Sequence, residues 1–399
     1  MKISTLIKRE PFGDIFENTI MPFLNEYTGI EHEVCWNKNS VKSDQIWFCN
    51  PHINSIFIPE ANKEIFSSII GEYSSNPSSP WKNLVQKLYI YFSINKNTSK
   101  ILCKYKVSIS PPIDTAKNKL IIGGNNKIRI IDTNKNLVFV ILKKGFNKKY
   151  LEKEIFVRER FPYLPIPKIS NISKSKKWYS EEYIVGSPPN RLKNNIGDIA
   201  LINSFKMLFR LYKETKKDTS YLIYVNRIYQ ELISNLDNLN FIESKTLSDL
   251  LKIIDFVISY FKKNDNDIVL AYSHGDFHPG NIICNDDSFW IMDWEHSGEK
   301  SLSYDLIIML LGARIESGYS KRLLDIANNK VTDDKKRFIN EWPYLNWNEF
   351  KSRKEYLLVF ILEDLLFYLE EYNNMALYKN PSCLNLRCKE ITQFISNFK

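Results

Sequence analysis

The stretch "SHGDFHPGNIIC", residues 273–284, decides how the rest of the chain is interpreted. It places two histidines, an aspartate and an asparagine among glycines and a proline, and then becomes a short apolar run. Gly275, Pro279 and Gly280 disfavour a helix, so the polar side chains belong to a loop. The question is which chemistry needs an acid and an amide five residues apart on one loop.

Two chemistries do not fit this loop. His274 and His278 have the spacing of a helical zinc pair, but the segment is not helical and lacks the glutamate of an HExxH motif. A serine hydrolase would need GxSxG, which the stretch does not contain. An ordinary turn favours Asp, Asn and Gly, but rarely needs all of them in this order.

Phosphoryl transfer uses all of these groups. It needs a carboxylate that orients the attacking hydroxyl, oxygen ligands for magnesium and a cation on the phosphates. Asp276 and Asn281 supply the carboxylate and one oxygen ligand from a single loop. A second acid, Asp293 in "IMDWE", ends an apolar run, where it is costly unless it is paired or bound to metal. The sequence therefore predicts a phosphoryl-transfer site.

The two motifs resemble those of the aminoglycoside phosphotransferase and choline kinase superfamily, whose fold is related to that of protein kinases. "HGDFHPGNII" is similar to its catalytic-loop signature and "IMDWE" to its metal-binding signature. The resemblance implies Asp276 as catalytic base, and Asn281 and Asp293 as ligands of Mg²⁺. It implies that His274 braces the loop, and it leaves the role of His278 open.

The resemblance also implies how the phosphates of ATP are held. "FVILK" is similar to the third strand of the small lobe, so Lys143 is expected to contact the phosphates, with Lys144 as the alternative. Glu154 matches the helix glutamate that pairs with this lysine, although such an acid can also simply face solvent. Phe139 and Ile141 share the strand face of Lys143, which is expected to face the nucleotide.

The remaining nucleotide contacts are implied in the same way. "EEYIVG" looks like the family hinge, so the backbone of Glu182 and Tyr183 is expected to bind adenine. "IIGGNNKIRI" stands where the family has a glycine-rich loop, and Gly123 and Gly124 would let backbone amides approach phosphate. The match to that loop is weak. The resemblance covers residues 119–372 and is strongest in the two motifs.

The order of expected elements agrees with this reading. Residues 127–132 and 137–143 predict a β-hairpin and residues 147–160 a helix, whereas amphipathic helices follow Pro189. We expect an α+β, bilobal protein-kinase-like fold with a small β-rich lobe and a larger helical lobe, and with ATP between them. The expected domains are an N-terminal extension of unknown role (1–115), the small lobe (116–188) and the helical lobe that carries both motifs (189–399).

The composition describes a folded chain. Its 399 residues are 44% apolar and 14% aromatic, and no apolar run reaches the length of a membrane span. The six cysteines form no CxxC pair, so neither disulfides nor zinc are expected. The prediction is a cytoplasmic protein. The net charge of +9 leaves peripheral membrane association open, but the basic segments lack interleaved aromatics, so no nucleic-acid partner is expected.

The predicted activity is that of an ATP- and Mg²⁺-dependent kinase acting on a hydroxyl of a small molecule or glycan. The alternative is a nucleotide-binding pseudokinase that serves as an interaction module. Four acids stand on one late helix: Glu363, Asp364, Glu370 and Glu371. They would suit a cationic acceptor if they faced Asp276, but the apolar spacing of residues 357–365 predicts that several face water. A sugar or anionic glycan is therefore expected; the oligomeric state is left open.

Overall fold

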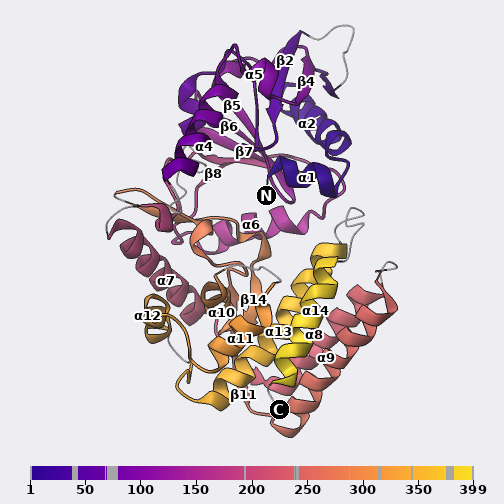
Figure 1. Cartoon of the computed structure of the whole chain (residues 1–399), viewed down its shortest axis with the longest axis vertical. Helices are drawn as coiled ribbons and strands as arrows, with labels where there is room; N and C mark the ends of the chain where they lie inside the picture. The colour runs from indigo at the N-terminus through magenta and orange to yellow at the C-terminus, as the bar shows by residue number, and fades with distance from the viewer. Residues whose placement is uncertain are drawn as a thin grey trace. The chain divides into compact units, whose positions relative to one another are not determined.

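The computed structural model describes residues 2–37, 44–67, 69, 80–192, 195–237, 239, 242–286, 288–312, 317–342, 345–373 and 382–397. The chain forms two compact units (Figure 1). Unit 1 comprises residues 1–160, 165–197 and 283–292, and unit 2 comprises residues 161–164, 198–282 and 293–399. Residues 1–115 and the small lobe therefore share one unit, and no boundary falls at residue 115.

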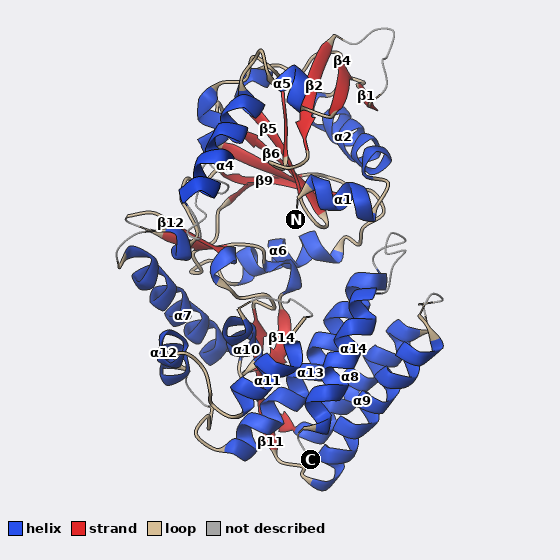
Figure 2. Cartoon of the chain, viewed as in Figure 1, coloured by secondary structure: helices blue, strands red, loops and turns tan. Residues whose placement is uncertain are grey.

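An antiparallel sheet forms the centre of unit 1 (Figure 2). Its described strands follow the order β1-β4-β2-β3-β5-β6-β7-β9-β8. Their bounds are β1 (Glu33–Trp36), β2 (Gln45–Asn50), β3 (Ser55–Phe57), β4 (Tyr105–Ser110), β5 (Lys119–Gly123), β6 (Lys127–Asp132), β7 (Leu137–Leu142), β8 (Ile169–Ile172) and β9 (Trp178–Glu182). Ile56 of β3 pairs with Ile121 of β5, so the N-terminal extension continues the sheet of the small lobe.

One face of this sheet is apolar and covered by the N-terminal segment. The helices α1 (Ile3–Arg9) and α2 (Phe12–Thr28) pack on it and form a single hydrophobic core with β5, β6 and β7. Phe139 and Ile141 belong to this core. The prediction that they face a nucleotide is therefore wrong, because the N-terminal helices occupy their side of the sheet.

The other described elements of unit 1 are helical or short. The helices are α4 (Pro80–Ile94), α5 (Ser99–Leu102) and α6 (Lys149–Arg160), with single turns η1 (Lys63–Phe66), η2 (Ala116–Asn118) and η3 (Pro189–Arg191). The strands β12 (Ile282–Cys284) and β13 (Phe289–Ile291) form a separate two-stranded sheet. Cys284 of β12 pairs with Ser187, which ties this hairpin to unit 1.

Unit 2 is mainly helical. Its described helices are α7 (Ile196–Thr215), α8 (Tyr221–Leu236), α9 (Ser244–Lys263), α10 (Tyr304–Leu311), α11 (Tyr319–Ala327), α12 (Asp333–Glu341), α13 (Phe350–Asn373) and α14 (Ser382–Ser396). A small sheet of β10 (Lys217–Ser220), β11 (Asp267–Ser273) and β14 (Gly298–Ser301) accompanies them. The α+β class is confirmed, with strands concentrated in unit 1 and helices in unit 2.

Helix α13 is the core of unit 2. It packs against α8, α9, α10 and α11 (Figure 1). Residues 357–362 are all buried, so the helix is buried almost all round. Ser220 caps the neighbouring helix α8, since its hydroxyl accepts a hydrogen bond from the N–H of Ile223 at 3.2 Å. Among the described helices, none has the length and hydropathy that crossing a membrane requires.

Candidate functional site

A buried carboxylate binds the backbone of the loop that carries the first motif. Asp305, in the first turn of α10, is fully buried. Its oxygens accept hydrogen bonds from the N–H groups of His274 at 2.8 Å and Gly275 at 2.9 Å, and from the hydroxyl of Tyr212 at 2.8 Å. Asp305 thus sets the backbone of the loop just before Asp276. Sequence reasoning missed it, although an acid within the apolar run "YDLIIMLL" was a signal.

The predicted base and the predicted amide ligand are in contact. The Nδ2 of Asn281 donates to the backbone oxygen of Asp276 at 2.9 Å and to its Oδ2 at 3.2 Å. The N–H of Asp276 donates to Nδ1 of the buried His274 at 3.2 Å, so His274 braces the loop as predicted. The Nε2 of His278 lies 3.6 Å from Oδ2 of Asp276. The Asp276 side chain keeps 24% of its surface exposed, so a small molecule can reach it.

The second motif packs directly on this loop. Gly275 has a φ of +84°, and a Cβ on it would lie 2.1 Å from the backbone oxygen of His296. Only glycine fits so close a contact with this conformation. The rings of His274 and Trp294 have centroids 4.6 Å apart. The segment that begins at Asp293 is therefore held against the loop that carries Asp276.

Asp293 itself has an unusual backbone. Its φ of 58° and ψ of 56° are left-handed, just before the turn η5 (Trp294–His296). Aspartate and asparagine adopt this conformation more readily than other non-glycine residues, because their short polar side chains can form local hydrogen bonds. Asn281 precedes β12 and Asp293 closely follows β13, so both stand at the open end of the hairpin. Asp293 remains the predicted metal ligand.

The donor set suits a hard cation. Asp293 offers carboxylate oxygens, and Asn281 offers its Oδ1 because its Nδ2 already donates to Asp276. Within the described ranges, no cluster of three or more His, Cys, Asp or Glu is arranged to hold a metal. Mg²⁺ does not require such a cluster, since it keeps several waters and also binds substrate phosphates.

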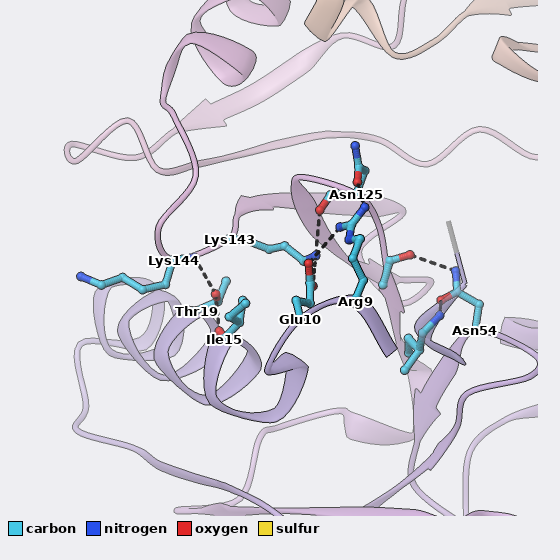
Figure 3. A network of polar contacts seen from close by, with 10 residues as sticks. Arg9, Glu10, Ile15, Thr19, Asn54, Asn125, Lys143 and Lys144 are labelled. Carbon is cyan, nitrogen blue, oxygen red and sulfur yellow. Dashed lines mark hydrogen bonds and ion pairs between the residues drawn. The ribbon is translucent and has the colours of Figure 1, made fainter. Parts of the chain in front are cut away.

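Lys143 does not pair with Glu154. Its ammonium donates to Oε1 of Glu10 at 2.5 Å and to the backbone oxygen of Asn125 at 2.7 Å, and the ion pair is fully buried (Figure 3). The predicted pair is wrong because Lys143 lies on the sheet face covered by α1 and α2. The alternative, Lys144, is exposed, and Figure 3 shows its side chain directed away from this network.

Glu154 pairs instead with Lys127, the first residue of β6. The Nζ of Lys127 lies 2.9 Å from Oε1 of Glu154, and the hydroxyl of Tyr179 donates to Oε2 at 2.5 Å. Alternation along β6 explains this choice, since Ile128 and Ile130 belong to the apolar core and Lys127 therefore points to the opposite face. The alternation of side chains along β6 could be seen in the sequence. Which face of the sheet α1 and α2 cover could not.

The face that carries Lys127 holds further buried charge. Arg158 of α6 pairs with Glu181 at 2.5 Å. Burial raises the pKa of Glu181, and the adjacent Arg158 opposes this shift. Burial also raises the pKa of Tyr179 well above its usual value, and the carboxylate of Glu154 adds to the shift. Tyr179 therefore stays a neutral hydrogen-bond donor to Glu154.

Lys143 gives a pH-dependent prediction. Burial lowers its pKa to about 8, from the usual 10.5, although Glu10 opposes this shift. Between these two pH values the unfolded chain binds the proton more tightly than the folded chain, so raising the pH favours folding. The stability of the wild type relative to Lys143→Met should therefore increase from pH 8 to pH 10.5. Denaturant unfolding of both proteins across this range checks it; a constant difference would contradict it.

The backbone N–H groups of the predicted hinge donate hydrogen bonds within unit 1. The N–H of Glu182 donates to the backbone oxygen of Lys168, and the N–H of Tyr183 donates to that of Asn136, both at 3.1 Å. These two N–H groups therefore already have backbone partners in this structure. The expected contact of the backbone of Glu182 and Tyr183 with adenine remains a prediction.

The two predicted glycines form a tight turn between β5 and β6. A Cβ on Gly123 would lie 2.7 Å from Cγ1 of Ile3, and one on Gly124 would lie 2.8 Å from the backbone oxygen of Lys127. Packing of α1 against the turn therefore accounts for Gly123. Contact of this turn with phosphate remains a prediction.

The acids of α13 do not face water as predicted. Three of the four are buried: Glu363, Asp364 and Glu371. Glu363 accepts hydrogen bonds from the hydroxyls of Tyr224 at 2.5 Å and Ser301 at 2.6 Å. Asp364 accepts one from the hydroxyl of Tyr319 at 2.9 Å. The prediction failed because α13 is buried on nearly every side. Its apolar stripe therefore does not mark the boundary between a buried face and a solvent-exposed face.

A family model described as the phosphotransferase enzyme family (APH) matches residues 229–331. This segment is less than half of the chain, but it contains the loop with Asp276 and Asn281, as well as Asp293 and Asp305. The resemblance inferred from the two motifs is confirmed over this range. No curated protein matches the sequence.

Several solved structures are similar in outline. Choline kinase LicA from Streptococcus pneumoniae has a TM-score of 0.44 and 10% identity, covering 71% of this chain and 92% of its own. An ethanolamine kinase of Plasmodium vivax has a TM-score of 0.45 and 16% identity, and the match covers 82% of this chain and 91% of the kinase. The aminoglycoside phosphotransferase APH(2'')-Ib bound to ADP has a TM-score of 0.46 and 11% identity, and the match covers 68% of this chain and 92% of that enzyme. Similarity this low carries no argument about residues or activity.

Proposed function

We propose that the protein is an ATP- and Mg²⁺-dependent phosphotransferase that moves the γ-phosphoryl group to a hydroxyl of a small molecule or glycan. The observation that carries the proposal is the position of Asp276. Its carboxylate is partly exposed, contacts Asn281, and sits on a loop whose backbone the buried Asp305 fixes. An acid held in this way can orient an acceptor hydroxyl and take its proton.

The reaction assigns one step to each group. Asp276 accepts the proton of the acceptor hydroxyl while the oxygen of that hydroxyl bonds to the γ-phosphorus. The bond between the γ-phosphorus and the β–γ bridging oxygen breaks, and ADP leaves. Asn281 and Asp293 would hold Mg²⁺, which when bound neutralises charge on the phosphate oxygens. Asn281 also keeps Asp276 oriented through its hydrogen bond of 3.2 Å.

The proposed acceptor is a sugar or glycan hydroxyl. Glu363 and Asp364 are engaged by tyrosine and serine hydroxyls inside unit 2, which removes them as a site for a cationic acceptor. The ring of His296, whose backbone oxygen touches Gly275, packs on Phe367 at 4.7 Å. Phe367 remains partly exposed, and an aromatic surface of this kind suits the apolar face of a sugar ring.

The test is a phosphorylation screen with the full-length protein. Mg·ATP would be incubated with sugars, choline, ethanolamine and aminoglycosides, and mass spectrometry would detect the phosphorylated product. Transfer that Asp276→Asn abolishes supports the proposal, and the acceptor identifies the class. Tight ATP binding without transfer to any compound would favour the pseudokinase, and no ATP binding would contradict both functions.

Asp293 gives a second test of this assignment. Asp293→Asn keeps a side chain that tolerates the left-handed backbone but removes the charge from the metal. The Mg²⁺-dependent part of the ATP affinity should fall about tenfold or more, as even indirect damage to metal sites costs this much. Calorimetric titration with ATP, with and without Mg²⁺, measures it. An unchanged dependence on Mg²⁺ would rule out Asp293 as a ligand.

A further inference from the structure

Both faces of the unit 1 sheet carry buried ion pairs. The face under α1 and α2 holds the hydrophobic core and the pair Lys143–Glu10. The other face carries the buried ion pairs Lys127–Glu154 and Arg158–Glu181. Burying charges costs free energy even when they are paired, and apolar residues would often serve stability as well. The N-terminal segment encloses Lys143, whereas Lys127 lies on the face that α1 and α2 do not cover.

Lys127 is held in place at the edge of the glycine turn. It follows Asn126 directly and begins β6, while Glu154 reaches it from α6 at 2.9 Å. The hydroxyl of Tyr179 occupies the second oxygen of Glu154, so the carboxylate cannot swing away from Lys127 without losing that bond. A lysine held by a carboxylate keeps its ammonium in one position, so less side-chain entropy is lost when that ammonium binds a phosphate.

Asn126, next to Lys127, has an unexplained side chain. The residue is 1% exposed, and neither its Oδ1 nor its Nδ2 has a hydrogen-bond partner among the residues that the structure describes. Buried amides are rarely left in this state, because the lost hydrogen bonds to water are not replaced. A ligand that brings oxygen atoms to Nδ2 would satisfy the group.

Lys143 is engaged from the apolar side of the same turn. Its ammonium bridges Glu10 and the backbone oxygen of Asn125, and Arg9 donates to Oδ1 of Asn125 at 2.6 Å (Figure 3). Asn54 donates to the backbone oxygen of Gly123 at 2.9 Å. The N-terminal segment thus clamps the turn and uses Lys143 as an anchor.

We propose that Asn126 and Lys127 contact the phosphates of the nucleotide, and that Lys143 instead fixes the N-terminal helix to the glycine turn. Lys127 supplies the positive charge and Asn126 a neutral donor. Lys143 acts as a positioning residue through Asn125 and Glu10. This assignment rests on the phosphotransferase function proposed above. It gives Lys127 the phosphate contact that the sequence analysis expected of Lys143.

The experiment compares two matched lysine variants of the full-length protein, Lys127→Met and Lys143→Met. Affinities for Mg·ATP and for adenosine are measured by competition with a fluorescent nucleotide, together with the melting temperature. A phosphate contact changes only the affinity for ATP, whereas a structural defect changes both affinities together. Lys127→Met should lower the ATP affinity about tenfold or more, the usual value of a lost charge-assisted hydrogen bond, and leave adenosine binding unchanged.

Lys143→Met should show the opposite pattern of affinities, whereas the melting temperature should fall in both variants, because each leaves a buried carboxylate without its lysine. Glu10 would lose its buried partner at 2.5 Å, so the melting temperature should fall. The ratio of ATP affinity to adenosine affinity should stay at the wild-type value. Lys127→Arg should restore part of the ATP preference, because it returns the charge.

Asn126→Leu separates the amide from the lysine. Leucine has a similar size and removes two unsatisfied buried atoms, so the melting temperature should rise while the ATP affinity falls. A higher melting temperature with unchanged ATP affinity would overturn the role of Asn126. Loss of the ATP preference in Lys143→Met, with Lys127→Met like the wild type, would overturn the role of Lys127. A wild type that binds no nucleotide would instead refute the proposed function itself.

Discussion

Asp276→Asn should slow phosphoryl transfer by about a hundredfold to ten-thousandfold, the usual contribution of a general base, while ATP affinity stays at the wild-type value. Asparagine matches aspartate in size and can still accept the hydrogen bond that Asn281 donates at 3.2 Å. It cannot take the proton of the acceptor hydroxyl. The substitution therefore removes the chemistry without removing the nucleotide site.

The measurement uses the acceptor found in the phosphorylation screen, with initial rates at saturating ATP and a separate titration of ATP. His278→Asn is the matched control, because Nε2 of His278 lies 3.6 Å from the same carboxylate and is the nearest rival base. A modest effect of His278→Asn is expected. If His278→Asn were inactive and Asp276→Asn retained the wild-type rate, the base would be His278.

The loop could be predicted because its geometry is local. Asp276 and Asn281 are five residues apart on a segment that glycine and proline keep out of a helix, so their contact follows from the spacing. His274 braces the loop through a bond to a residue two positions away. Helix α8 (Tyr221–Leu236) is one of the amphipathic helices predicted after Pro189, and a serine cap and a regular apolar pattern define it.

The partner of Lys143 could not be predicted, because it depends on which sheet face is covered. Glu10 stands 133 residues away in the sequence, in a segment that had no interpretation. Alternation along β6 and β7 shows that Lys127 and Lys143 point to opposite faces, but not which face receives α6. That depends on α1 and α2, which cover the apolar face. The family pattern therefore paired Glu154 with Lys143, whereas the lysine that pairs with Glu154 is Lys127 of β6.

The carboxylate beneath the loop was missed for a similar reason. Asp305 lies about thirty residues after the groups that it binds, in a run with the periodicity of an ordinary buried helix. A buried acid always needs partners, so the sequence signalled that some existed. It did not identify the backbone N–H groups of His274 and Gly275, because main-chain donors leave no trace in a sequence.

Among the proposed variants, Asp305→Ala should therefore cause the largest loss in the free energy of unfolding. It leaves three buried donors without an acceptor: the N–H groups of His274 and Gly275 and the hydroxyl of Tyr212. An unsatisfied buried donor costs about 1–3 kcal/mol, so unit 2 should lose about 3 kcal/mol or more. The loop should also lose the conformation that positions Asp276, and phosphoryl transfer should fall even where the protein remains folded.

Tyr212→Phe separates these two consequences. It removes one donor and leaves both backbone bonds of Asp305 intact, so it should cost about 1 kcal/mol and leave the loop in place. Native-state hydrogen exchange at His274 and Gly275 reports the loop directly. These two amides should exchange much faster in Asp305→Ala and at the wild-type rate in Tyr212→Phe. Equal protection in wild type and Asp305→Ala would mean that the carboxylate does not hold the loop, and that the position of Asp276 has another origin.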